Sequence, residues 1–174
     1  MIQYLYRGAC TLIGAVLLVA TTESASPPPQ LSPNSIDKIV VYKSKRQLQL
    51  CNQDRVIKTY RVALGKNPTG HKEKRGDNKT PEGTYRITAK NTASKFHKSL
   101  RISYPNQDDI LCAKKNCLDP GGDIMIHGLG KKYAWVGKMH ANRDWTQGCI
   151  AVSNDEMDEI FSATQVGAEI NIYA

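Results

Sequence analysis

The sequence lacks several features that would define its class at once. It contains only 5 cysteines in 174 residues, too few for a small scaffold built on disulfides. It shows no internal repeat, and its 40% hydrophobic residues, with 13 glycines and 8 prolines, exclude wholesale disorder, a collagen-like chain and a coiled coil. This length and composition are typical of one packed domain.

The charge is unbalanced but not concentrated. The chain has 24 Lys and Arg residues against 16 Asp and Glu residues, a net charge of +8 that favours an anionic partner. These basic residues are spread along the chain rather than gathered in one arm or helix, so we do not predict nucleic-acid binding. The four histidines lack the spacing of known metal-ligand motifs, and we predict no metal site.

The apolar run near the N-terminus is short for a membrane anchor. Residues 8–22 are uncharged and would span about 22 Å as a helix, less than the roughly 30 Å of a bilayer core. Together with Arg7 before the run and small residues after it, this predicts a secretory signal over residues 1–26 and a proline-rich tether over residues 27–37. The alternative is an uncleaved anchor. We expect a periplasmic or otherwise exported protein of the cell envelope, without a stable membrane anchor after cleavage.

Residues 38–174 form the predicted folded domain, and strands outnumber helices in it. Only residues 155–163, with Asn154 as the expected cap, have a clear helical pattern, and the stretch between Tyr104 and Pro120 is expected to be irregular. The pattern therefore predicts a mainly β fold with one or two short helices, arranged as an antiparallel β-sandwich or barrel. Strands are predicted over residues 38–42, 47–51, 56–64, 84–89, 99–104, 123–127, 149–152 and 170–173.

Export affects how the cysteines are interpreted, because an oxidising compartment tends to pair free thiols. Cys112 and Cys117 lie five positions apart and are able to close a small ring, whereas Cys51 ends an alternating apolar run that indicates a core position. Cys149 follows a glycine and precedes an apolar strand. Its two interpretations are a structural disulfide with Cys51 and a free, reactive thiol.

Reactive side chains are expected where strands meet loops. His127 ends one predicted strand and Cys149 begins another. If the two strands are neighbours, His127 can approach Cys149 and favour its thiolate, the form that attacks a carbonyl. Gly148 lets the backbone approach a substrate closely, and nearby N–H groups could hold an oxyanion. This combination is typical of an acyl-transfer site, although a lone His and a lone Cys can also be structural.

Several separated motifs occur together in one order. This set resembles the L,D-transpeptidase catalytic domain, or YkuD-like family, in its exported murein-transpeptidase branch, from about residue 38 to residue 173. The motifs are Gly76-Asp77, Thr80-Pro81-Glu82-Gly83-Thr84-Tyr85, Ile102-Ser103-Tyr104-Pro105-Asn106, Pro120-Gly121-Gly122-Asp123, His127-Gly128, Asp144-Trp145-Thr146-Gln147-Gly148-Cys149-Ile150 and Asn154.

The resemblance implies roles for individual residues. Cys149 matches the family nucleophile, His127 the general base, Gly148 part of the backbone around the oxyanion, and Thr146 the Ser or Thr that supports the loop. It also implies a thioester cycle on peptidoglycan stem tetrapeptides, with an amine of a neighbouring stem as acceptor or, alternatively, the lysine of a lipoprotein attached to the wall. Neither a metal nor an organic cofactor is needed for this chemistry.

The sequence departs from the family pattern in two ways. Gln147 stands where many members have a histidine, and an amide does not take up a proton near neutral pH. His127 and Cys149 are 22 positions apart, a longer interval than the commoner one, and the insert carries His140, which is either a substitute for the missing histidine or an exposed loop residue. Trp145 either walls the cleft or packs in the core. The residues predicted to contact substrate are Gly128, His140, Trp145, Thr146 and Gln147.

Two other functions remain open at this point. A hydrolase could use the same thioester to trim stem peptides or to release attachments from them, as an L,D-carboxypeptidase, endopeptidase or amidase. A wall-binding module without catalytic activity would keep His127 and Cys149 as structural residues.

Overall fold

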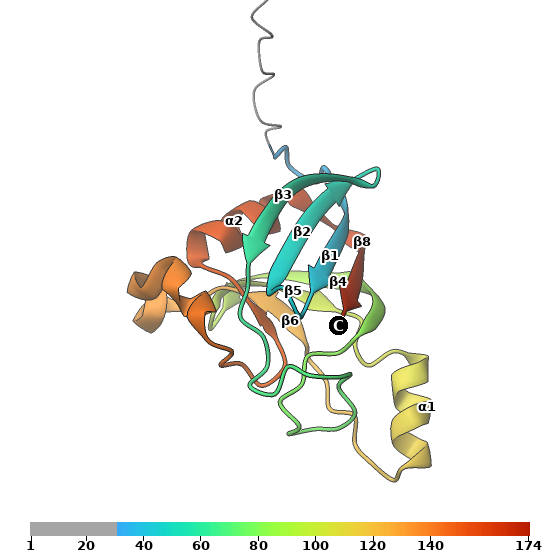
Figure 1. Cartoon of the computed structure of the whole chain (residues 1–174). Coiled ribbons are helices and arrows are strands. Elements are labelled where there is room, and N and C mark those ends of the chain that lie inside the picture. The colour runs from blue at the N-terminus through green and yellow to red at the C-terminus, as the bar shows by residue number, and fades with distance from the viewer. Residues whose placement is uncertain (1–30) are drawn as a thin grey trace, which may run out of the picture.

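The computed structural model describes residues 31–174 (Figure 1). The predicted secretory signal and the first residues of the predicted tether, up to residue 30, lie outside the described residues. The folded domain starts slightly earlier than predicted, because its first strand begins at Ile36 rather than at Lys38. Within residues 31–174, no helix combines the length and apolar character needed to cross a bilayer.

The chain forms one curled eight-stranded sheet with short helical segments around it. This confirms the mainly β fold class. The strands are β1 (Ile36–Tyr42), β2 (Gln47–Asn52), β3 (Arg55–Arg61), β4 (Gly83–Ser94), β5 (His97–Ile102), β6 (Met125–His127), β7 (Ile150–Ala151) and β8 (Thr164–Tyr173). The helical segments are α1 (Gln107–Lys115), the 3-10 segment η1 (Lys131–Asn142) and α2 (Asn154–Ala163).

The strand order β3-β2-β1-β8-β4-β5-β6-β7 brings the two ends of the sheet together. Most neighbours are antiparallel, as predicted, but β1 pairs with β8 and β6 with β7 in parallel. The chain just after β3 reaches β7 through Ala63 and Ala151, whose backbones exchange two hydrogen bonds of 3.0 and 2.8 Å. The sheet therefore closes like a barrel, and β7 lies at the seam.

Alternating apolar residues explain how the strands bury one face. In β1 the buried positions are Ile36, Ile39 and Val41, and β2 contributes Leu48 and Leu50 to the same core. Helix α2 adds Met157, Ile160 and Ala163, spaced three residues apart, so that one helical stripe covers the end of the sheet. The core thus holds the sheet and α2 together, and Cys149, just before β7, is only half-buried at its edge.

The structure corrects two details of the helices. Helix α1 occupies part of the stretch that was expected to be irregular, because Asn106 and Asp109 form a reciprocal capping box at its start. Helix α2 is capped by Ser153 rather than by Asn154, with Glu156 completing the box. Both corrections follow from capping signals that are present in the sequence.

The cysteines of residues 31–174 are all free thiols. The small ring that Cys112 and Cys117 are able to close is not formed in this structure: Cys112 lies within α1 and Cys117 two residues after its end, both exposed. The alternative pairing of Cys51 with Cys149 is also not formed. Cys51 is buried in β2, as predicted, and Cys149 is half-buried and free.

Candidate active site

Strands β6 and β7 are parallel neighbours, which meets the condition stated for the two candidate residues. His127 is opposite Ala151, and Cys149 stands two residues before Ala151. Cys149 directly precedes β7, and side-chain alternation continued by one residue would place it on the face of the sheet that carries His127. Two residues along a strand rise about 6.6 Å and neighbouring strands lie about 4.8 Å apart, an offset that two side chains leaning toward each other can bridge.

His127 is enclosed by aromatic rings and oriented by a backbone carbonyl. Its exposed fraction is 3%, with the Phe96 ring centroid at 4.5 Å and the Trp145 ring edge-on at 5.8 Å. Its Nδ1 lies 2.6 Å from the carbonyl oxygen of Gly128. A carbonyl only accepts, so Nδ1 carries the proton and Nε2 keeps its lone pair. Burial lowers the pKa of His127 below 6.5, and the hydrogen bond to the Gly128 carbonyl opposes this only in part. The lowered pKa keeps the ring neutral at pH 7.

Cys149 is a neutral thiol at pH 7, just as His127 is a neutral imidazole. Its Sγ lies 3.7 Å from the Asp123 carbonyl oxygen, within reach of a weak S–H donor. Burial raises the pKa of Cys149 above 9.0, although the Met125 N–H and the charge of Lys72 favour the thiolate. Burial of both groups favours a protonated thiol and a neutral imidazole before substrate binds.

The hydroxyl of Thr146 organises the loop before Cys149. Thr146 Oγ1 donates to the Cys149 carbonyl oxygen at 2.7 Å and accepts from the Gly148 N–H at 3.0 Å. The supporting role predicted for Thr146 matches these bonds, whereas its predicted substrate contact does not, because the residue is buried and its hydroxyl is used within the loop. The Gly148 N–H is likewise engaged and is not free to hold an oxyanion. Among residues 31–174, no acceptor is found for the Cys149 N–H.

Two further contacts hold this loop in position. Gly148 has φ +134°, a conformation that favours glycine, and a Cβ there would lie 2.7 Å from the carbonyl oxygen of Lys79. Asp144 accepts from the Leu64 N–H at 2.9 Å and binds Arg46 at 2.8 Å, which ties the loop to the chain after β3. The position of Cys149 therefore depends on segments far away in the sequence.

Cys149 opens into a cleft of about 790 Å³. Gln147 lies at its wall, and the charged lining residues are Lys72, Arg75 and Arg101 on the positive side and Asp123 on the negative side. Lys72 is almost buried there and is held by Asp77 at 2.7 Å. The lining residues are Lys72, Arg75, Gly76, Asn78, Arg101, Pro105, Gly121, Gly122, Asp123, Ile124, Gln147 and Cys149. The described residues contain no group of three or more His, Cys, Asp or Glu placed to hold a metal ion.

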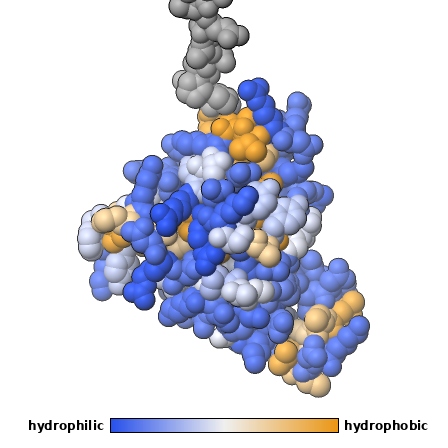
Figure 2. Space-filling model, in the orientation of Figure 1, coloured by the Kyte–Doolittle hydropathy of each residue, from blue (hydrophilic) through white to orange (hydrophobic). Residues whose placement is uncertain are grey.

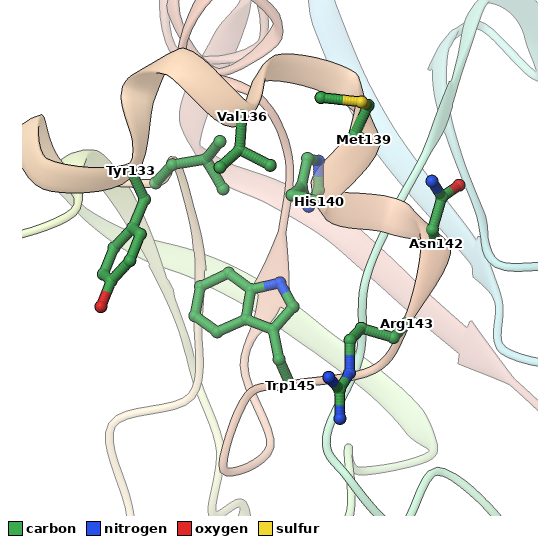
Figure 3. A pocket seen from close by; sticks show the side chains of 8 residues that line it. Tyr133, Val136, Met139, His140, Asn142, Arg143 and Trp145 are labelled. Carbon is green, nitrogen blue, oxygen red and sulfur yellow. The ribbon is translucent and has the colours of Figure 1, made fainter.

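The other predicted contact residues lie outside this cleft. Gly128 is buried, and a Cβ on it would meet Asn154 Oδ1 at 2.6 Å, so its role is to fit beneath the loop and to orient His127. Trp145 packs on His127 and lines a second, separate hollow together with His140 (Figure 3). His140 is 6% exposed, which corrects the expectation of an exposed loop residue: the fold of η1 turns it inward.

Sequence reasoning missed two contributors to the site. Phe96 lies in the turn between β4 and β5, far from the motifs, and no local pattern indicates that it covers His127. The Lys72–Asp77 ion pair lies in a basic stretch of sequence, and such stretches are ordinarily exposed to solvent, whereas this pair is buried. Asp77 was part of the quoted motifs, so the buried pair could have been suspected from that position.

A family model described as the L,D-transpeptidase catalytic domain, YkuD, matches residues 36–172. The chain therefore belongs to the L,D-transpeptidase catalytic domain family, which confirms the resemblance of the motifs. Among curated proteins, "Putative L,D-transpeptidase YqjB" of Bacillus subtilis (strain 168) is 28% identical over 138 residues, covering 77% of this chain and 69% of the relative. "Putative L,D-transpeptidase YafK" of Escherichia coli (strain K12) is 27% identical over 130 residues, covering 71% of this chain and 45% of the relative.

Solved structures share the fold. The helical cell shape determining protein Pgp2 from Campylobacter jejuni superposes with a TM-score of 0.62 at 22% identity, over 82% of this chain and 50% of Pgp2. An L,D-transpeptidase from Mycobacterium smegmatis gives a TM-score of 0.53 at 15% identity, over 80% of this chain and 59% of that protein. The chain thus spans about half the length of Pgp2 and less than half of YafK.

Proposed function

We propose that this protein is an exported cysteine acyltransferase of the cell envelope that acts on peptidoglycan stem tetrapeptides. Cys149 attacks the carbonyl before the terminal D-residue, that residue leaves with its amine, and a thioester remains. An amine then attacks the thioester and restores the thiol. The amine comes from a neighbouring stem or from the lysine of a lipoprotein attached to the wall. The observation that carries the proposal is the β6–β7 register, which would place His127 and Cys149 on a common face.

His127 acts as a general base during the attack rather than as the partner of a preformed thiolate. The Gly128 carbonyl fixes the proton on Nδ1, and Nε2 is left to accept the thiol proton as sulfur attacks. The lowered pKa of His127 keeps this nitrogen unprotonated at neutral pH. The same imidazole then returns the proton to the leaving amine.

The cleft supports binding of an anionic peptide and stabilisation of the oxyanion. Arg75 and Arg101 line the cleft in exposed ion pairs with protein carboxylates, and they can exchange these partners for the carboxylates of a stem peptide. Lys72 stays paired with Asp77. The Cys149 N–H replaces the Gly148 N–H as the proposed oxyanion donor, because Thr146 already holds the latter. Neither the cations of the cleft nor the Cys149 N–H requires a cofactor for these roles.

The proposal is tested by incubating the protein with purified tetrapeptide muropeptides and weighing the products. Crosslinked dimers indicate transfer, and trimmed monomers indicate that water resolves the same thioester, so that the protein is a hydrolase. We also expect a stable carbapenem adduct that is lost in Cys149→Ala and kept in Cys112→Ala, which removes an exposed thiol. If the muropeptides stay unchanged and Cys149 stays unmodified, the enzyme proposal is wrong, and the remaining hypothesis is a wall-binding module without catalytic activity.

A further inference from the structure

Segment η1 stands out from the domain between two anchored ends. In Figure 1 its orange coils project at the left, beyond the sheet and α2. At its start, a Cβ on Gly130 would lie 2.6 Å from the carbonyl oxygen of Lys95, and at its far end His140 is 6% exposed. Between these ends, seven of the nine residues from 131 to 139 are exposed. This stretch, the η1 tip, is therefore a convex surface that is fixed to the domain at both ends.

Large apolar side chains of the η1 tip are exposed to water. Tyr133 is 54% exposed, Met139 61% and Trp135 78%, the last being the highest value for a large apolar residue within residues 31–174. Trp135 does not line the hollow beneath η1. At the left edge of Figure 2, apolar residues gather where Figure 1 shows η1, on a face that is otherwise largely hydrophilic. Apolar side chains gathered in this way on the surface of a domain mark an interaction surface.

The η1 tip and the residues after it carry positive charge without acidic neighbours in the sequence. Residues 131–143 contain no acidic residue, and their cations are Lys131, Lys132, Lys138 and Arg143. Lys138 lies 3.9 Å from Glu156 of α2. The other three cations are exposed, and within residues 31–174 they form no ion pair. Their charge is thus available to a partner.

The acidic residues of α2, the helix that Lys138 contacts, do not cancel this charge. Asp158 and Glu159 form ion pairs with lysines of the sheet, and the Glu156 side chain is only 11% exposed. Asp155 is the one acidic residue of α2 without an ion pair in the described part of the chain. Three free cations against one free carboxylate leave this edge of the domain positive.

An anionic phospholipid surface fits this combination of groups. Tryptophan and tyrosine rings settle at the interface of a bilayer, where the ring leaves water and its N–H or O–H group stays hydrated. Lysines beside such rings are attracted by anionic head groups. A protein partner would need a cavity shaped to enclose the η1 tip, whereas a lipid surface has no fixed shape and can admit a convex segment. The η1 tip therefore favours a lipid surface over a protein.

We propose that the η1 tip docks the protein onto an anionic phospholipid bilayer, with Tyr133, Trp135 and Met139 in the head-group region and the free cations on the anionic head groups. Such a contact is shallow and reversible, because only a few side chains enter the interface. It goes beyond the proposed function, since it needs neither Cys149 nor a stem peptide. The chain continues from η1 into the loop that ends at Cys149, so docking would hold the candidate active site near the bilayer.

The test uses the full chain with Trp145→Phe, which leaves Trp135 as the only tryptophan. Its emission is measured with vesicles of phosphatidylglycerol and phosphatidylcholine, and with vesicles of phosphatidylcholine alone, each containing lipids brominated on the upper acyl chain. On the anionic vesicles we expect quenching and a blue shift of Trp135, with an apparent affinity about tenfold or more higher than on phosphatidylcholine alone. Because the signal comes from Trp135, binding through the apolar run of residues 8–22 does not produce it.

Two adjacent lysine pairs provide a matched control. Lys131→Gln together with Lys132→Gln removes two cations of the η1 tip and should weaken the apparent affinity for anionic vesicles about tenfold. Lys114→Gln together with Lys115→Gln removes an exposed pair at the end of α1 and should leave this affinity unchanged. The comparison separates the local charge of the η1 tip from the net charge of the chain.

Unquenched Trp135 on anionic vesicles would overturn the proposal, and so would equal effects of the two lysine pairs or equal quenching on both kinds of vesicle. A blue shift with purified peptidoglycan but not with vesicles would assign the η1 tip to the wall polymer instead. If Trp145→Phe does not fold, the quenching is taken as the difference between the parent chain and Trp135→Phe. Cys149→Ala should keep the lipid signal, so that a failure of the thioester chemistry and a failure of docking are told apart.

Discussion

Two hollows flank one short loop, and their chemistry differs. On one side, Cys149 and Gln147 open into a cleft with buried and exposed charges such as Lys72 and Arg101. On the other side, Trp145 faces an apolar pocket whose main polar group is the unpartnered His140. Only four positions separate Trp145 from Cys149, so a single loop serves both surfaces.

Charged side chains line the cleft and apolar ones line the pocket, so we expect the two hollows to differ in what they bind. His127 packs against Trp145, which lines the pocket, and stands on β6 next to the strand that follows Cys149. The following predictions test whether this division holds.

The largest effect is expected from His127→Gln. An amide of similar size can keep the hydrogen bond to the Gly128 carbonyl but cannot take up the thiol proton, so acylation by a carbapenem should slow by about 10²- to 10⁴-fold. The rate is followed by mass spectrometry, and the fold by circular dichroism. His97→Gln, which alters a partly exposed ion pair with Asp158, serves as the control and should leave the rate almost unchanged. A normal rate in His127→Gln would remove this residue from the cleft chemistry.

Gly148→Ala should be the next most damaging change. Its φ of +134° is strained for alanine, and the added Cβ would overlap the Lys79 carbonyl, so the free energy of unfolding should fall by about 3 kcal/mol in urea titration. Gly167→Ala is the matched control, because its φ is +92° but nothing lies within 4 Å of the added Cβ. We expect a loss of only about 1 kcal/mol there. Equal losses of unfolding free energy at both sites would mean that the loop before Cys149 shifts to make room for the added Cβ.

The smallest of the three effects concerns the charged wall of the cleft. Although burial raises the pKa of Asp77, Lys72 and three backbone N–H groups lower it to about 2. A depressed carboxyl pKa stabilises the fold above the unfolded value of 3.8, and this contribution is lost as the pH falls through about 2. Asp77→Asn should therefore cost about 2 kcal/mol of unfolding free energy at pH 7 and almost nothing near pH 2.

The control for this prediction is Asp54→Asn, which breaks an exposed ion pair with Lys38. Exposed pairs contribute roughly 0–1 kcal/mol, so this variant should change the unfolding free energy little at either pH. A difference between wild type and Asp77→Asn that stays constant from pH 7 to pH 2 would contradict the role of the charge.

Much of the fold and part of the site can be read from local patterns. Alternation in 38–42 and 47–51 predicts the first hairpin because each strand buries one face, and β1 and β2 confirm it. Strands are predicted to end at His127 and to begin at Cys149, and the pairing of β6 with β7 meets the condition that they be neighbours. Such features depend on neighbouring residues, which a sequence displays directly.

The remaining features depend on contacts between distant segments. Phe96 reaches His127 from the turn after β4, and His140 becomes buried only because η1 folds back over the loop of Trp145. Helix α1 is a different case, since the capping residues Asn106 and Asp109 were visible in the sequence. Burial also raises the pKa of Cys149, an effect that no spacing of residues reveals.

The seam of the barrel limits how a substrate can approach. Strand β7 pairs with β6 on one side and with Ala63 on the other, so the strand that follows the nucleophile has no unpaired edge. An incoming peptide is therefore unable to extend the sheet at this point, as ligands of many peptide-binding domains do. A peptide that occupies the cleft would have to be held by side chains and loop backbone alone, so the proposed activity does not require its substrate to form a regular strand.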